Sequence, residues 1–159
     1  MNSAILLLPQ EKTTKKNEMG FYSLNIDQLK KLPVILGETD PLKTITLLPG
    51  IKSGGEAGSG IYVRGGGPDQ NLILLDDIPV YNPNHLLGFF SVFNGDAIKS
   101  VSVKKGDMNA AYGGRLSSVI SIDTREGDKD SLKLSGGIGL ISSKLSIEGP
   151  LVKNKASFI

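Results

Sequence analysis

The sequence predicts an α+β domain of short strands and short helices, followed by an antiparallel β meander. Twenty glycines and eight prolines in 159 residues indicate many turns and little long helix. Several short segments alternate apolar and polar residues with the period of two that strands show. One segment instead places apolar residues three apart behind an Asp-Pro pair, a pattern typical of a helix start.

Composition excludes several classes of protein. The absence of cysteine excludes a disulfide framework and any thiolate metal site. A net charge of +2 with both signs interspersed does not suggest a nucleic-acid-binding surface. The apolar run at residues 4–8 is too short to span a bilayer and is no complete signal peptide.

The first third of the chain contains two predicted helices. Residues 1–19 are expected to form a flexible arm, and residues 25–32 could make about two helical turns. In the second helix Asp40 is the expected N-cap and Pro41 the first helical residue, and Pro49-Gly50 stops it. Its apolar face is Leu42, Ile45 and Leu48. Residues 51–60 lack side chains that pack, so we expect a mobile loop or a segment of close approach.

The middle of the chain contains most of the predicted strands. Asp76-Asp77 is expected to form a tight hairpin turn, because aspartate tolerates the left-handed conformation that such turns require. We expect an irregular stretch with one short helix at 81–94 and a helical turn at 94–98. The predicted strands are 61–64, 72–75, 78–80, 100–104 and 119–124, the last packing through Val119 or Ile120 and Ile122.

Period-two patterning continues beyond residue 127. Strands are predicted at 132–138 and 144–148, with a turn over 149–155 and a new strand from Ala156. This pattern suits both a soluble antiparallel meander and the strands of a membrane β-barrel. Because the chain stops within the third strand, we expect it to be a fragment.

Three candidate chemical sites are weak. The stretch from Arg64 to Asp69 matches neither common phosphate-loop pattern, and Pro68 removes a backbone donor from it. Asp76 and Asp77 are adjacent, so they do not form a convergent acid/base pair. The single histidine, His85, has no second ligand or nucleophile beside it. We therefore expect no catalytic residue, no metal site and no cofactor.

Five motifs in order resemble the N-terminal plug domain of TonB-dependent outer-membrane receptors. They are LLPG at 47–50, IYVRG at 61–65, NLILLD with IPV at 71–80, IKSVSVKKG at 98–106, and YGGR running into VISI at 112–122. The resemblance covers about residues 20–127, and the tail resembles the first strands of the receptor's barrel. The family usually has glycine where this chain has Asp77.

The resemblance implies a gate without bond chemistry. The implied fold is a small mixed sheet with short helices (residues 20–127), lodged in a 22-stranded barrel of the outer membrane that begins at residues 128–159. The implied ligand is scarce and too large for porins, such as a metal chelate, cobalamin or an oligosaccharide. TonB would supply the energy by gripping an N-terminal segment, for which this chain offers Ile5, Leu6, Leu7 and Leu8.

The same resemblance implies roles for particular residues. Arg64 and Arg115 hold the positions of arginines that pair with carboxylates of the barrel wall, and we expect them to latch the plug. The expected ligand-facing residues are Gly65, Gly66, Gly67, Asp69, Gln70, Asn82, Asn84 and His85. The alternative is a stand-alone soluble module that binds a protein or glycan, and this fragment alone is expected to be soluble.

Overall fold

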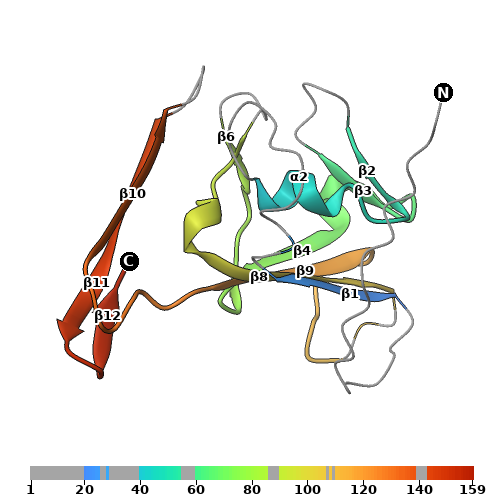
Figure 1. Cartoon of the computed structure of the whole chain (residues 1–159). Helices are drawn as coiled ribbons and strands as arrows, with labels where there is room; N and C mark the ends of the chain where they lie inside the picture. Colours follow the sequence, from blue (N-terminus) through green and yellow to red (C-terminus); the bar gives the residue numbers. More distant parts are fainter. Residues whose placement is uncertain are drawn as a thin grey trace.

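A five-stranded mixed sheet lies at the centre of the molecule (Figure 1). The computed structural model describes residues 20–25, 28, 40–54, 60–85, 90–106, 108, 110–138 and 143–159. The β4 and β9 strands run parallel, and the other neighbours in the sheet are antiparallel. The strand order is β1 (Phe21–Asn25), β8 (Ile98–Lys105), β9 (Ser118–Thr124), β4 (Asn71–Leu75) and β5 (Ile78–Pro79). The predicted α+β class with a small mixed sheet is confirmed.

Strands β8 and β9 supply the centre of the hydrophobic core. Val101 lies opposite Ile122 and Val103 opposite Ile120, and all four side chains are fully or almost fully buried. Of the two alternatives for β9, Ile120 therefore shares the core face with Ile122. This alternation of buried and half-exposed residues is what the period-two pattern predicted.

Strand β1 was not predicted. It pairs along its length with β8 at the edge of the sheet, and Leu24 is its one buried residue. The helix predicted at 25–32 therefore starts no earlier than the end of β1. Asn25 and Gln28 exchange two backbone–side chain hydrogen bonds of 3.0 and 3.1 Å, a capping box typical of a helix start. The remainder of that prediction lies outside the described residues.

Helix α2 (Pro41–Ile45) lies over one face of the sheet (Figure 1). Asp40 is its N-cap, as predicted: Oδ1 accepts hydrogen bonds from the backbone N–H groups of Leu42 and Lys43. The helix is shorter than predicted, because it ends at Ile45 and hydrogen-bonded turns continue to Gly50. Its buried side chains join the core beneath it.

Two short hairpins lie beside α2. Strand β2 (Ile51–Ser53) pairs with β3 (Ile61–Val63), so the loop predicted for 51–60 is wrong for its first three residues. Pairing with β3 buries Ile51 and turns it inward. The second hairpin pairs β6 (Asn84–His85) with β7 (Phe90–Ser91). Of the stretch predicted to hold a short helix, residues 86–89 lie outside the described part.

Tight turns connect the remaining elements. Asp76 and Asp77 have φ values of 46° and 66° and join β4 to β5, with Leu75 opposite Ile78. Positive φ at both central residues is the property of a type I′ turn, which confirms the predicted hairpin. The helical turn predicted at 94–98 is the 3₁₀ helix η3 (Gly95–Ala97), and a second 3₁₀ helix, η1 (Pro68–Gln70), precedes β4.

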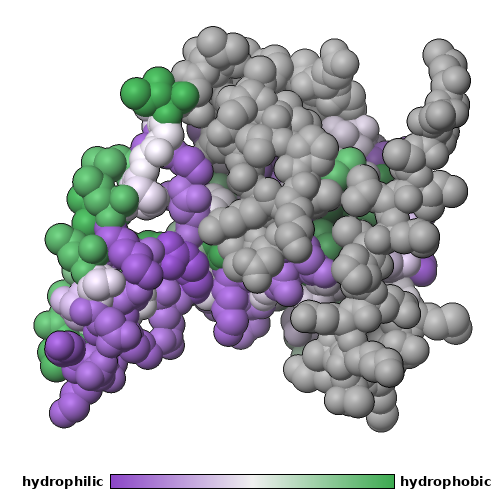
Figure 2. All heavy atoms as spheres, in the orientation of Figure 1, coloured by the Kyte–Doolittle hydropathy of each residue, from purple (hydrophilic) through white to green (hydrophobic). Residues whose placement is uncertain are grey.

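The last third of the chain is an antiparallel meander, as predicted, of β10 (Lys133–Ile138), β11 (Ser143–Val152) and β12 (Ala156–Phe158). Strand β11 is longer than expected, which leaves only residues 153–155 for the last turn. Figure 2 shows apolar side chains along the outer edge of the meander, with polar ones nearer the rest of the molecule. Among the described residues, no helix is long and apolar enough to cross a membrane.

Candidate ligand-binding site

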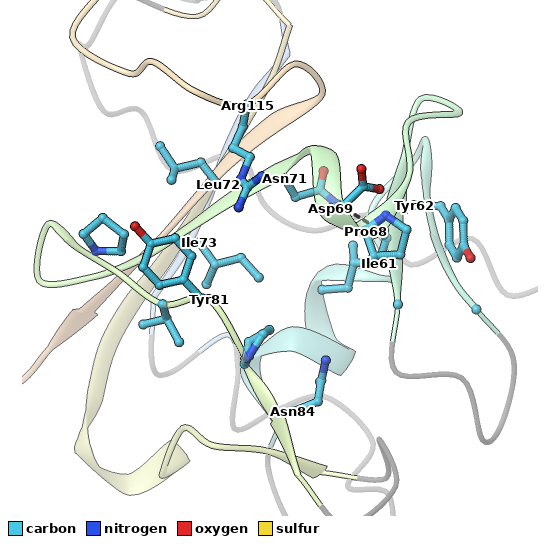
Figure 3. A pocket seen from close by; sticks show the side chains of 15 residues that line it. Ile61, Tyr62, Pro68, Asp69, Asn71, Leu72, Ile73, Tyr81, Asn84 and Arg115 are labelled. Carbon is cyan, nitrogen blue, oxygen red and sulfur yellow. Dashed lines mark hydrogen bonds between the residues drawn. The ribbon is translucent and has the colours of Figure 1, made fainter.

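An open pocket of about 480 Å³ lies where four separate segments meet (Figure 3). The segments are the ends of the β2–β3 hairpin, η1 with β4, the chain after β5, and the loop before β9. The lining residues that carry polar groups or rings are Tyr62, Asp69, Asn71, Tyr81, Asn84 and Arg115. Because these residues are distant in the sequence, only the fold brings them together.

Asn71 holds three of these segments in place. It is 6% exposed, and its Nδ2 donates to the backbone oxygens of Ile61 at 2.6 Å and Gly67 at 3.2 Å. Its Oδ1 accepts from Ser118 Oγ at 2.8 Å. One buried amide thus joins β3, the loop after it and β9, and the buried Ile61 oxygen and Ser118 hydroxyl find their partners in it.

Within the described part of the chain, the pocket lining carries one positive and one negative side chain. Arg115 is half-buried, and Figure 3 shows its side chain pointing in beside Leu72. Asp69 supplies the one carboxylate among the lining residues. Tyr81 is 84% exposed, so its ring is available for contact. Within the described residues, no three histidine or carboxylate side chains lie close enough to hold a metal ion.

Arg64 lies in a tight turn just after β3. Arg64 and Gly65 have φ values of 47° and 86°, and Gly66 N donates to Val63 O at 2.9 Å. A Cβ on Gly66 would lie 2.4 Å from Ser117 Oγ, so only glycine fits there. The turn therefore requires glycine for two reasons: Gly65 has a positive φ, and Gly66 has no room for a Cβ atom.

The Arg64 guanidinium lies near Lys105 at the end of β8. Cβ atoms built on Gly20 and Gly106 would lie 3.2 and 3.1 Å from its terminal nitrogens, so glycine lets the side chain approach the backbone. Lys105 is 3% exposed, donates to the Pro49 carbonyl oxygen, and its Nζ lies 4.0 Å from the Tyr22 ring centre. Burial, and secondly the charge of Arg64, lower the pKa of Lys105.

The structure brings together only some of the predicted site residues. Asp69 and Asn84 line the pocket, and so does Arg115, for which the resemblance predicts a latch role. The predicted ligand-facing residues outside the lining are Gly65, Gly66, Gly67, Gln70, Asn82 and His85. The TonB segment at residues 5–8 lies outside the described residues.

Of the six polar or aromatic lining residues named above, three were not predicted as site residues. Tyr62 was assigned only to a strand and Asn71 only to a motif. Tyr81 was assigned to irregular chain. The one available signal was a tyrosine at an outward position of a strand, since Tyr62 is 41% exposed between two buried neighbours.

A small mixed sheet, the helix α2 over one of its faces and an open pocket where four segments meet are the features by which this domain can be compared with known proteins. The chain belongs to the TonB-dependent receptor plug domain family, which matches residues 16–119. The predicted family is therefore confirmed, and it is a family of outer-membrane receptors.

Relatives of known identity agree with this assignment. The chain is 25% identical over 174 residues to the probable TonB-dependent siderophore receptor PirA of Acinetobacter baumannii, covering 90% of this chain and 22% of that protein. It is 30% identical over 126 residues to the ferrienterobactin receptor of Escherichia coli, covering 68% of this chain and 16% of that protein.

Solved structures show the same fold. A crystal structure of a variant of the ferric enterobactin receptor PfeA from Pseudomonas aeruginosa superposes with a TM-score of 0.64 at 24% identity. The match covers 87% of this chain and 23% of that one. In each comparison the chain spans less than a quarter of the known protein's length.

Proposed function

We propose that the chain is the plug and the first barrel strands of an outer-membrane transporter, and that its pocket binds an imported ferric siderophore complex. The observation that carries the proposal is the convergence of four segments of a plug fold on one pocket with exposed tyrosine rings. The names of the two curated relatives, both siderophore receptors, support the ligand class. Transport is gating, powered by TonB acting on the N-terminal side.

The pocket chemistry favours a ligand of low net charge on the plug side. Among the described residues, one guanidinium and one carboxylate line it, whereas a strongly anionic complex is usually met by several cations. Tyrosine rings and the Asn84 side chain offer stacking surface and hydrogen bonds instead. An uncharged ferric trihydroxamate matches this lining better than a strongly anionic ferric tris-catecholate.

The two arginines have different environments, and we assign them different roles. Arg115 lines the pocket, which favours contact with the ligand. Arg64 stands beside Lys105 near Gly20, where a barrel carboxylate would relieve the repulsion between the two cations. Arg64 therefore keeps the proposed latch role, with Lys105 as its companion.

Uptake by the whole receptor tests this proposal. Cells that depend on this receptor for iron would be given radioactive iron as a ferric trihydroxamate or as a ferric tris-catecholate. We expect uptake of the trihydroxamate, and we expect Tyr81→Ala and Arg115→Ala to reduce it about tenfold, the effect of losing one good binding contact. Lys52→Ala, which removes an exposed charge outside the pocket, is the control. Normal uptake in both pocket variants would refute the site.

A further inference from the structure

Strand β11 presents a polar face toward the plug and an apolar face away from it. Lys144, Ser146 and Glu148 alternate with Leu145 and Ile147 along the strand. The two apolar side chains are 69% and 46% exposed, whereas Ser146 between the two charges is 9% exposed. The plug therefore covers the polar face of β11.

Two ion pairs join this polar face to the plug. Lys144 Nζ lies 2.8 Å from Asp96 Oδ2, and Glu148 Oε2 lies 2.5 Å from Arg125 Nη1. The side chains are 15–32% exposed, so water screens them less than it screens a surface pair. We call these four residues, Asp96, Arg125, Lys144 and Glu148, the β11 clamp.

Arg125 is held in position by the plug before it reaches β11. Its backbone N–H donates to Ala97 O at 2.9 Å, and its Nε donates to Asp96 O at 2.5 Å. Both acceptors belong to η3, whose start is capped by the side chain of Asn94 bonding to Asp96 N. These bonds orient the guanidinium toward Glu148, so Arg125 loses little conformational entropy when it forms the ion pair.

The chain beyond Arg125 packs against the meander as well. A Cβ on Gly127 would lie 2.0 Å from Phe158 O, so the backbone of this segment lies directly on β12. Asn154 N donates to Lys129 O at 3.1 Å. Strand β9 ends at Thr124, so Arg125 directly follows a strand of the central sheet.

We propose that the β11 clamp is a second charge-paired surface, in addition to the Arg64 latch, that fixes the plug to the barrel, with Arg125 as its positioning residue. This inference rests on the proposed function, since it takes β10–β12 as the first barrel strands. The plug side of the surface is η3 with Arg125, and its partner is the polar face of β11. Breaking the clamp frees this side of the plug and opens a leak through the barrel.

The test uses the whole receptor in planar bilayers and in outer-membrane vesicles. Arg125→Glu and Glu148→Arg each place like charges together, and the double exchange restores an opposite pair. We expect each single variant to raise basal conductance and the rate of plug proteolysis roughly tenfold, the effect of losing a charge-assisted hydrogen bond. We expect the double exchange to return both close to the unmodified receptor.

The matched control is Lys129→Ala. It removes an ion pair with Glu126 whose side chains are 42% and 77% exposed, and we expect it to change neither readout. Where charge reversal prevents assembly, Arg125→Gln and Glu148→Gln make the same test. Single variants that assemble and stay as closed as the unmodified receptor overturn the clamp, and so does a double exchange that leaks like the singles.

The clamp and the ligand proposal fail separately. A receptor that takes up neither ferric chelate but leaks when the clamp is broken refutes the ligand and supports the clamp. A receptor that takes up the trihydroxamate and does not leak in the clamp variants refutes the clamp and supports the ligand.

Discussion

Replacing Asn71 with alanine is expected to destabilise the plug more than any surface change. The substitution leaves two backbone oxygens, of Ile61 and Gly67, without their side-chain donor and removes the acceptor of Ser118 Oγ. Asn71 is 6% exposed and Ser118 is fully buried, so water replaces these bonds poorly. Three hydrogen bonds at roughly 0.5–1.5 kcal/mol each correspond to a loss of about 1.5–4.5 kcal/mol.

A loss of this size is a large fraction of the roughly 5–15 kcal/mol that stabilises an ordinary domain. Urea unfolding followed by circular dichroism measures it, as a lower midpoint with an unchanged slope. Asn82→Ala is the control, because Asn82 is exposed and expected to cost under about 0.5 kcal/mol. Equal midpoints for the two variants would show that Asn71 does not hold the pocket segments together.

Two predictions concern the Asp76-Asp77 turn. Asp77→Gly should raise the free energy of unfolding by about 0.5–1 kcal/mol, because glycine adopts a φ of 66° without steric cost. The gain is partial, because glycine also loses more conformational entropy on folding than aspartate does. A lower melting temperature for this variant would contradict the prediction. Asp76 accepts hydrogen bonds from Thr124 N and Oγ1, which lower its pKa below the ordinary value for an aspartate. The stabilisation that the Asp76 carboxylate gives the folded state is present above the ordinary aspartate pKa and is lost as pH falls through the lowered pKa of the folded state. Asp76→Asn should therefore be less stable than the unmodified chain at pH 7 and equally stable in acid. A stability difference that stays constant across pH would argue against a role for the carboxylate.

Local chemistry made part of the fold predictable. Asp40 and Pro41 begin a helix because a carboxylate can cap free N–H groups and proline needs no donor there. The aspartates at 76 and 77 form the predicted turn because neighbouring strand residues constrain the connection to two positions. Order and spacing of five motifs then indicated the family, which the comparisons confirm.

Other elements carried no local signal. Strand β1 buries only Leu24, so its residues do not alternate clearly, and it exists because β8 offers a free edge to pair with. Strand β2 is three residues long and is defined by its pairing with β3. The resemblance implied a mixed sheet, but periodicity could not show which strands run parallel.

The sequence by itself determined the helix cap, the turns, the alternating strands and the family. The cap, the turns and the strands each depend on residues within a few positions of one another, and the family depends on the order of five short motifs. The tertiary structure alone decided that Arg115 lines a pocket with Tyr81, and that Arg125 meets Glu148 at 23 positions' distance. Exposed or half-exposed polar residues have no periodicity of their own, so their partners are set only when burial of the core brings distant segments together.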